Sequence, residues 1–385
     1  MRIPIDQDYL VETLQKLVRI NSINPELTPH GPGEVHIGEY IAEELTTLGL
    51  SPHIHKLKPK RCNVVAILKG SGGGRSLMFN AHMDTVGVAG MKDPFSAKIR
   101  DGKLYGRGAQ DMKGSLAAML AALKALVDSK VHLKGDLVFA AVADEEHGSI
   151  GTETLIQKFR TDAAIVTEPS GLDIGLAHRG FEVFEIMTQG FATHGSLYQD
   201  GIDANMHMGR IMAELDRHSQ ALLQGPKHPL VGPPSLHIPL INGGQGLFIY
   251  ADKCTISVER RTLPDETHAN VVNEMESILM KVAKEDETVK ATMKEVLHRD
   301  GYEISPESDI VQTLTAASSS VLHREPVYTG HQWWEDSALL GEAGIATVIF
   351  GPQGAGAHSH EEWVDIQSVI DTAAILTETA IRFCG

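Results

Sequence analysis

Five short motifs in the sequence contain residue types that can bind a metal ion or move a proton. The first is Ala-His-Met-Asp-Thr-Val at residues 81–86, directly after an apolar segment. Residues two apart on an extended chain point to the same side, so His82 and Asp84 would project together from a strand end. Such a pair suits an imidazole metal ligand that is oriented by a carboxylate. A turn with incidental polar residues is the alternative for this motif alone.

The second motif, at residues 105–114, is a glycine-rich loop that leads into a helical pattern. Such loops can bind phosphate at a helix N-terminus, but neither the GxxxxGK[ST] nor the GxGxxG spacing is present. The glycines can instead let the backbone bend so that Asp111 points into a cleft. An ordinary turn or N-cap aspartate is the simpler interpretation of this segment by itself.

The other three motifs carry carboxylates or an imidazole after further apolar segments. Glu145 and Glu146 are adjacent on an extended end and point in different directions, so one can bind metal while the other acts as a general base. Glu168 follows the apolar segment at residues 163–167, and His358 stands in a glycine-rich loop. Taken singly, these residues are typical of a solvated charge run or an exposed histidine. Together, the donors are oxygen and nitrogen without sulfur, which favours a hydrolytic zinc, cobalt or manganese site over a structural zinc.

The elements that would position these motifs alternate along the chain. Helical patterns occur near residues 10–18, 37–48 and 115–127, and apolar segments predict strands at residues 63–68, 76–81, 136–142, 163–167 and 346–350. Strands that alternate with helices favour an α/β fold with a mixed, largely parallel sheet flanked by helices. Ligands of such sheets bind at the carboxyl ends of the strands, which is where the motifs lie.

From about residue 180 the pattern changes. We expect strands at 181–188, 235–241 and 253–261, and helices at 204–218 and 268–282. This order predicts a small α+β domain inserted into the larger one. The expected boundaries are residues 1–179 and 294–385 for the catalytic domain and residues 180–293 for the insertion.

Composition excludes several classes of protein. The 385 residues carry 34 basic and 50 acidic side chains, a net charge of −16, which disfavours nucleic acid as a partner. The three cysteines, Cys62, Cys254 and Cys384, have no CxxC spacing and predict neither a disulfide framework nor a thiolate metal site. We find no signal-peptide pattern at the start and no apolar stretch long enough to span a membrane, so a cytoplasmic protein is expected.

Along nearly its whole length, the sequence resembles the zinc-dependent amidohydrolases that include acetylornithine deacetylase, succinyl-diaminopimelate desuccinylase, aminoacylase and carboxypeptidase G. The matching motifs are AHMDTV, GRGAQDMKG, DEEHGS, VTEPS and GPQGAGAHSHEEW. The resemblance implies two zinc ions, with cobalt or manganese as alternatives. It assigns His82 and Glu168 to one metal, Glu146 and His358 to the other, and Asp111 to both.

The resemblance also implies roles around the metals. Asp84 would orient His82, and Glu145 would be the general base that takes a proton from water. The peptide bond after Asp111 would be cis. Two divalent ions would balance the three ligand carboxylates and one hydroxide, whereas the carboxylates alone would raise one another's pKa. His360 is an alternative ligand, but the spacing in this family favours His358.

The inserted domain resembles the lid and dimerisation domain of the family. His194 falls where the family has a histidine that reaches the partner's site in a homodimer and stabilises the oxyanion. Arg261 falls where an arginine binds the substrate carboxylate, although a surface ion pair is the alternative. Three positions depart from the family pattern: Phe248 and Ala251 stand where relatives commonly have Asn and Pro, and Glu335 where they often have Thr.

We therefore expect a metal-dependent amidohydrolase that cleaves the amide of an N-acyl amino acid, with Glu145, Asp84 and His194 as catalytic residues. A metallo-dipeptidase or carboxypeptidase with the same site is the alternative. Two other classes remain: a binding or scaffold protein that has lost catalysis, and a nucleotide-binding protein.

Overall fold

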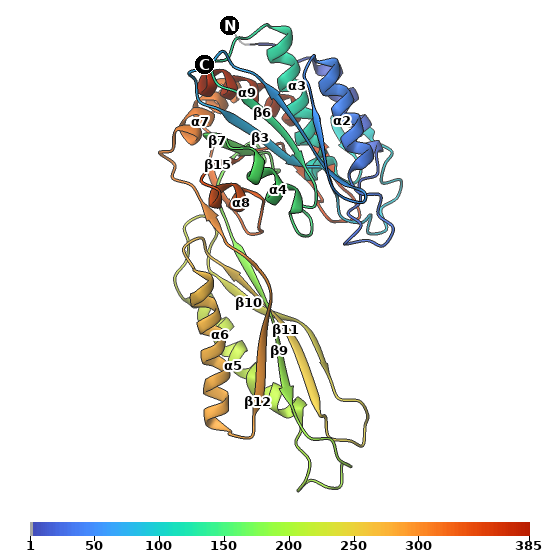
Figure 1. Ribbon diagram of the computed structural model, residues 1–385, viewed down its shortest axis with the longest axis vertical. Helices are drawn as coiled ribbons and strands as arrows, with labels where there is room; N and C mark the ends of the chain where they lie inside the picture. Colours follow the sequence, from blue (N-terminus) through green and yellow to red (C-terminus); the bar gives the residue numbers. More distant parts are fainter. Residues whose placement is uncertain (1–2) are drawn as a thin grey trace. The chain divides into compact units, whose positions relative to one another are not determined.

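The computed structural model describes residues 3–385, which form two compact units (Figure 1). Unit 1 comprises the described residues up to Leu176, together with Ile304–Thr329 and Glu335–Gly385. Unit 2 comprises Ala177–Glu303 and Gly330–Trp334. Unit 2 continues to Glu303, beyond the predicted end of the insertion at residue 293, because one more strand completes its sheet.

The main sheet of unit 1 has the strand order β1-β2-β6-β3-β7-β15-β8. Its strands are β1 (His53–Lys58), β2 (Arg61–Leu68), β6 (Leu137–Val142), β3 (Leu77–His82), β7 (Ala163–Val166), β15 (Ala346–Ile349) and β8 (Ile174–His178). Strands β6, β3, β7 and β15 run parallel, whereas β1 and β2 are antiparallel to their neighbours. The predicted mixed, largely parallel sheet is confirmed.

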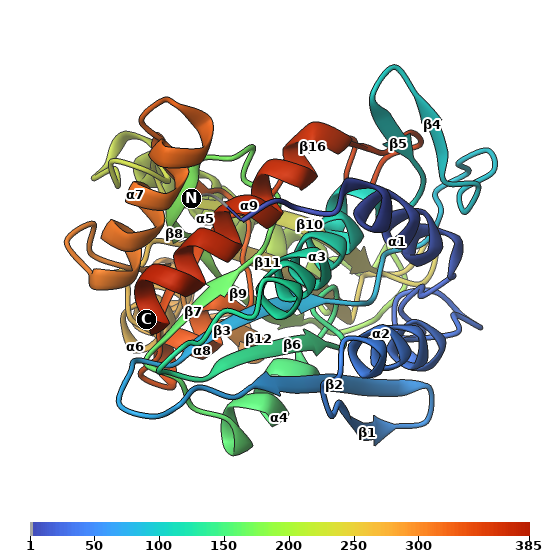
Figure 2. The same ribbon diagram turned by 90° about the horizontal axis from the view of Figure 1, so that it is seen from above.

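Helices cover both faces of this sheet (Figure 2). One face carries α1 (Gln7–Arg19), α2 (Val35–Thr47), α3 (Gly114–Asp128), α7 (Asp309–Leu322) and α9 (Ile366–Cys384). The other carries α4 (Ile150–Lys158) and α8 (Ser337–Glu342), whose Leu155 and Leu340 pack against the sheet core. Strands buried on both faces read as continuous apolar runs, which is why the sequence marks them so clearly.

A second, small sheet brings two distant motifs together. Its order is β16-β17-β5-β4, with β16 (Gly354–Ala355), β17 (Trp363–Asp365), β5 (Lys103–Tyr105) and β4 (Lys98–Arg100). Trp363 pairs with Tyr105 across this sheet. The loop after β5 and the loop between β16 and β17 therefore lie next to each other, and these loops carry Asp111 and His358.

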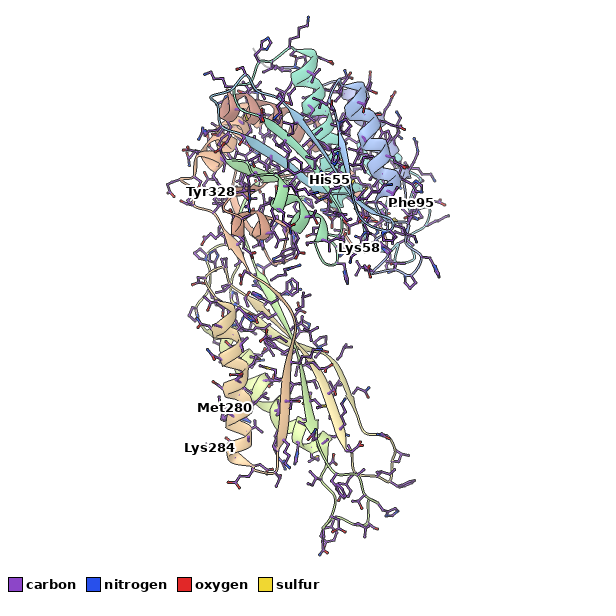
Figure 3. The ribbon with its side chains drawn as sticks, in the orientation of Figure 1. His55, Lys58, Phe95, Met280, Lys284 and Tyr328 are labelled. Carbon is purple, nitrogen blue, oxygen red and sulfur yellow. The ribbon has the colours of Figure 1, made fainter. Side chains whose placement is uncertain are left out.

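Unit 2 is a four-stranded antiparallel sheet in the order β10-β11-β9-β12, with two helices on one face (Figure 1). Its elements are β9 (Gly180–Gln189), α5 (Ala204–Gln224), β10 (Ser235–Gly243), β11 (Lys253–Thr262), α6 (His268–Glu285) and β12 (Lys290–Arg299). Met280 and Lys284 mark the solvent side of α6, one helical turn apart (Figure 3). Strands β8 and β14 (Tyr328–His331) connect the two units through the chain, and β13 (Tyr302–Glu303) pairs with the last two residues of β8.

Candidate metal centre

Three of the predicted residue groups lie at the carboxyl ends of adjacent parallel strands. His82 is the last residue of β3, Glu146 follows β6 and Glu168 follows β7. In the register of the sheet, His82 is paired with Val142 of β6. The strand ends are therefore level, and the side chains that follow them meet at one edge of the sheet.

Asp111 reaches the same edge from an irregular turn, η1 (Ala109–Lys113), just before α3. Gly108 precedes this turn with a φ of 79°, and a Cβ there would come within 2.7 Å of Thr85 Cγ2. Only glycine fits this conformation and this space. The Asp111–Met112 peptide bond is cis, as the family resemblance implies.

The two carboxylate oxygens of Asp111 face two different sets of donors. On one side, His82 Nε2 lies 2.9 Å from Asp111 Oδ1 and 3.6 Å from Glu168 Oε1. On the other side, His358 Nε2 lies 3.3 Å from Asp111 Oδ2 and 3.0 Å from Glu146 Oε2. The structure thus brings together all five predicted ligands, with Asp111 in the middle.

His358, and not His360, contacts this cluster. His358 has a φ of 60° in its glycine-rich loop and directs Nε2 toward Asp111 and Glu146. His360 instead lines a different cavity of about 490 Å³, together with Tyr105 and other residues outside the cluster. The geometry therefore separates the two histidines that the sequence left as alternatives.

Glu145 lies beside the His82 side of the cluster. Single ligand atoms of His82, Glu145 and Glu168 all lie within 4.8 Å of one another. Its neighbour Glu146 belongs to a second such group, with His82 and Asp111. The two adjacent glutamates thus serve different parts of the cluster, as their divergent directions on the chain predict.

Asp84 connects the imidazole to the glutamate turn. His82 Nδ1 lies 2.9 Å from the main-chain oxygen of Asp84 and 3.6 Å from its carboxylate Oδ1. The Asp84 carboxylate accepts hydrogen bonds from the backbone amides of Glu145 at 3.2 Å and Glu146 at 3.3 Å. One residue therefore orients the His82 ring mainly through its carbonyl and holds the following turn through its carboxylate.

Beneath the cluster lies a buried ionic network that contains Asp84 and four residues without a predicted role. Asn24 donates to Asp84 at 2.7 Å and to Asp144 at 2.9 Å. Arg61 donates to Asp144 at 2.8 Å and to Glu34 at 2.7 Å. All five side chains are at most 2% exposed. Asp84 and Asp144 lie in motifs that the sequence singled out, whereas Asn24, Glu34 and Arg61 do not.

Glu362 also supports the cluster without a role predicted from the sequence. Its carboxylate accepts hydrogen bonds from the backbone amides of Gly108 at 3.0 Å, Gln110 at 2.9 Å and Asp111 at 3.1 Å. It also binds the Arg107 guanidinium at 2.7 Å. Glu362 therefore fixes the turn that presents Asp111, and its place in the quoted C-terminal motif is the only sequence signal for it.

The electrostatics of the cluster follow from the crowding of carboxylates. Burial raises the pKa of Glu146 to about 7, and the charge of Asp111 adds to this shift. Burial and the charge of Glu168 raise the pKa of Glu145 well above its ordinary value. Burial likewise raises the pKa of Glu168. These carboxylates are fully ionised at neutral pH only if nearby positive charge compensates them.

The histidines supply part of that compensation. Hydrogen bonds to Asp111 and Glu146 raise the pKa of His358 to about 10. For His82, burial lowers the pKa, but hydrogen bonds to Asp111 and Asp84 outweigh it and the net value is raised. For Asp111, burial opposes the hydrogen bonds from His358 and His82, and these hold its pKa below the ordinary range.

The donor set fits two divalent ions. Imidazole nitrogens and carboxylate oxygens are the ligands of hydrolytic zinc sites. Within residues 3–385, Glu146 Oε1 is a buried oxygen that finds no hydrogen-bond partner. An oxygen of this kind, next to three other acidic side chains, is well suited to bind a cation.

The two predicted residues of unit 2 have contacts within that unit. The exposed His194 ring accepts at Nδ1 a hydrogen bond from the Ser196 amide at 3.2 Å, and Ser196 Oγ lies 2.8 Å from the same nitrogen. Arg261 Nε lies 2.5 Å from Glu259 Oε1. The ion pair that the sequence analysis named as the alternative for Arg261 is thus present.

Comparisons with known proteins identify the family of the chain. A family model described as peptidase family M20/M25/M40 matches residues 78–382. The chain is 29% identical to N-formyl-4-amino-5-aminomethyl-2-methylpyrimidine deformylase of Halalkalibacterium halodurans, over 97% of this chain and 95% of that protein. It is 28% identical to acetylornithine deacetylase of Myxococcus xanthus, over 90% of this chain and 92% of that protein.

A solved structure gives the same fold. The Bacillus subtilis protein described as a dinuclear metal-binding peptidase of the M20 family superposes with a TM-score of 0.76 at 17% identity, over 98% of each chain. The resemblance stated from the motifs is therefore confirmed. The chain belongs to peptidase family M20/M25/M40, whose members hydrolyse amide bonds.

Proposed function

We propose that the protein is a two-zinc amidohydrolase that removes an acyl group from the nitrogen of an N-acyl amino acid. The observation that carries the proposal is the division of donors around Asp111, with His82 on one oxygen and His358 on the other. A central carboxylate of this kind suits two ions that share one ligand. His82 and Glu168 would hold one zinc, and Glu146 and His358 the other.

Zinc ions at these positions would polarise the amide carbonyl and make water a stronger acid. The proton transfers are assigned to Glu145, which takes a proton from the attacking water and delivers it to the leaving amine. Its pKa, raised by burial and by the charge of Glu168, supports this assignment. A carboxylate with a raised pKa can keep the proton near neutral pH and then deliver it to the leaving amine.

Two residues of unit 2 are proposed to bind the substrate. Because His194 Nδ1 accepts a hydrogen bond from Ser196, Nε2 carries the ring proton of the neutral imidazole and is available to donate to an oxyanion. Arg261 would bind the substrate carboxylate, for which it would exchange its ion pair with Glu259. Substrate binding thus competes with an internal carboxylate.

We further propose a homodimer formed through unit 2, in which His194 serves the site of the partner. Strand β10 is at the edge of its sheet, and its Leu240 and Ile241 side chains are 67% and 60% exposed. Phe248, at a position that departs from the family pattern, is 74% exposed. An unpaired strand edge with apolar side chains is suited to pairing with a second copy. Sedimentation that shows an active monomer would contradict this proposal.

The substrate is proposed from the relatives together with the residues. The two relatives above act on formyl and acetyl groups, so a short acyl group is our first choice. An amine without a carboxylate, as in the deformylase, is the second candidate, and a dipeptide is the third. A cytoplasmic location remains a prediction, and among the described helices none is long and apolar enough to cross a membrane.

The proposal is tested by the release of free amine from N-formyl, N-acetyl and N-succinyl amino acids, an N-formylaminomethylpyrimidine and dipeptides. Each substrate is assayed with zinc and after chelation. We expect the fastest release from a short N-acyl amino acid, lost on chelation and restored by zinc. Faster cleavage of dipeptides would favour the peptidase alternative, and release that survives chelation would contradict a metal enzyme.

A further inference from the structure

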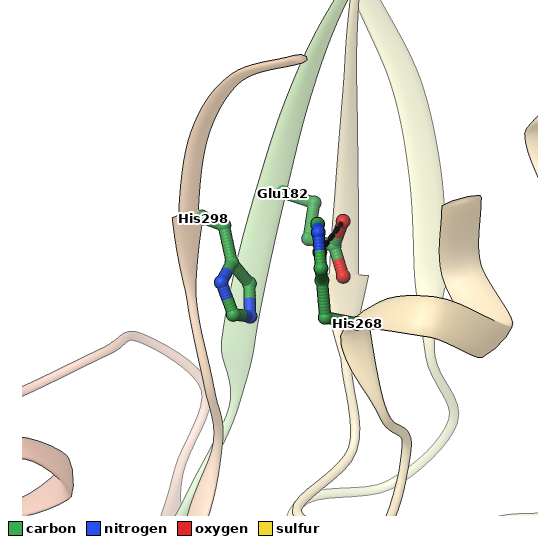
Figure 4. Close-up of side chains that lie close together, drawn as sticks. All are labelled: Glu182, His268 and His298. Carbon is green, nitrogen blue, oxygen red and sulfur yellow. Dashed lines mark hydrogen bonds and ion pairs between the residues drawn. The ribbon is translucent and has the colours of Figure 1, made fainter.

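A second cluster of imidazoles and carboxylates lies entirely within unit 2. It contains Glu182 of β9, His268 at the start of α6 and His298 of β12 (Figure 4). One potential ligand atom from each residue lies within 4.8 Å of the other two. None of these residues belongs to the site described above.

The position of Glu182 is unusual for a carboxylate. On β9, Glu182 is on the same side as Phe184 and Ile186, which form the apolar core beneath the helices. Glu182 is 2% exposed, and burial raises its pKa. A buried carboxylate in a core row destabilises the fold unless a partner compensates its charge.

The cation that is opposite Glu182 on the neighbouring strand is paired with other carboxylates. Arg260 of β11 is opposite Glu182 in the strand register. Its guanidinium makes ion pairs with Glu266 at 2.5 Å and with Glu274 at 3.0 Å. On the other side of β9, the residue opposite Glu182 is His298.

The contacts to Glu182 come from the imidazoles. His268 Nδ1 lies 3.0 Å from Glu182 Oε2, and the ring of His298 stacks on that of His268 with centroids 4.3 Å apart (Figure 4). Two protonated rings at this distance would repel each other. Neutral rings avoid the repulsion, and each then has a lone pair for a metal.

Two further carboxylates surround the imidazoles. Glu295 Oε2 lies 3.2 Å from His268 Nε2, and Asp300 Oδ1 lies 2.8 Å from His298 Nε2. With neutral rings, Glu182, Glu295 and Asp300 bring three negative charges. Carboxylates of this kind bind or orient metal-ligating histidines.

We propose that Glu182, His268 and His298 bind one additional divalent transition-metal ion, of the zinc class, in unit 2. Two imidazoles and a carboxylate form a donor set that zinc prefers. The 3.0 Å separation of His268 Nδ1 and Glu182 Oε2 is close to the edge of about 3.3 Å in a tetrahedron with bonds of about 2.0 Å. The ion would join β9, β12 and the first turn of α6, so its role is structural.

The competing explanation is a metal-free network in which a protonated His268 bridges Glu182 and Glu295. Zinc itself is the probe that separates the two. Chelated protein is titrated with zinc, and bound metal is counted per chain for the wild type and for His298→Asn. We expect the variant to bind one zinc fewer.

The matched control is His237→Asn, which removes an exposed histidine paired with Glu259 at 3.2 Å in the same unit. This control should bind as much zinc as the wild type. Equal zinc in the wild type and His298→Asn would overturn the proposal. Circular dichroism checks the fold, and Glu182→Gln, which keeps the shape of the side chain, should show the same loss.

A second measurement does not depend on a variant. Anomalous scattering from zinc-loaded wild-type crystals should show an ion within bonding distance of His268 Nδ1, Glu182 Oε2 and a ring nitrogen of His298. Ordered rings without an anomalous peak would overturn the proposal. Because amide hydrolysis is not measured in either experiment, failure here leaves the proposed function untouched.

Discussion

Glu362 accepts a hydrogen bond from the backbone amide of Asp111, with 3.1 Å between Oε1 and N, although 251 residues separate the two in the sequence. The carboxylate of Glu362 also accepts from two other amides of the same turn. The turn that presents the Asp111 side chain is therefore held by a residue outside the proposed set of metal ligands.

Glu362→Gln should weaken metal binding at Asp111. One oxygen that accepts from backbone amides becomes a donor, so the turn must shift. Loss of a supporting contact of this kind costs about 10–100-fold in metal affinity. Competition with a chromogenic chelator measures the change. The exposed neighbour provides the control, because Glu361→Gln should leave the affinity unchanged, and equal effects of both variants would contradict a positioning role.

Glu145→Gln should keep its metals and lose turnover. A general base contributes about 10²–10⁴-fold to the rate, so kcat should fall by that factor on the best substrate of the panel. Elemental analysis of the same sample should find as much zinc as in the wild type. An active variant with full metal would exclude Glu145 as the base, and a large loss of zinc would make it a ligand.

Arg61→Met should destabilise unit 1 strongly. The guanidinium is 1% exposed and compensates both Glu34 and Asp144, so its loss leaves buried carboxylates unpaired at a cost of about 3–5 kcal/mol. Urea unfolding measures the difference. Arg75→Met removes the exposed ion pair with Asp309 and should cost less than about 1 kcal/mol. Similar losses for both variants would show that the buried network contributes little.

Lys113→Met should remove part of the pH dependence of stability. Burial lowers the pKa of Lys113 from 10.5 to about 7 in the folded protein. The unfolded chain therefore binds more protons between those pH values, and the free energy of unfolding rises with pH across the window. The rise from this group is about 2–3 kcal/mol between pH 7 and pH 9, and it should disappear in Lys113→Met. Urea unfolding at both pH values, with the exposed Lys130→Met as control, tests this, and an unchanged pH dependence would contradict it.

The sequence predicts the strand ends well and the supporting contacts poorly, for physical reasons. Strands such as β3 and β6 are buried on both faces, so their apolar runs are evident and the residues that follow them can be placed at one edge. Strand β12 is mostly exposed and carries charges at an edge of its sheet, so the apolar pattern is absent and the end of the insertion was misplaced.

The residues that hydrogen-bond to the predicted site residues could not be predicted either, because they are distant in the sequence. Asn24 reaches Asp84 from 60 residues away and Asp144 from 120 residues away. Such contacts depend on how α1, β2 and the sheet pack, which no local spacing encodes. Asp111 itself was found because its motif is local, whereas Glu362, which positions it, was quoted in a motif without a role.

Asp111 is proposed to lie between two metal positions. Anomalous diffraction from zinc-loaded crystals would locate both ions. We expect two peaks in unit 1, one near His82, Glu168 and Asp111 Oδ1, the other near His358, Glu146 and Asp111 Oδ2. A single peak in this cluster, or a peak ligated by Glu145 in place of Glu168, would contradict a site in which Asp111 joins two ions.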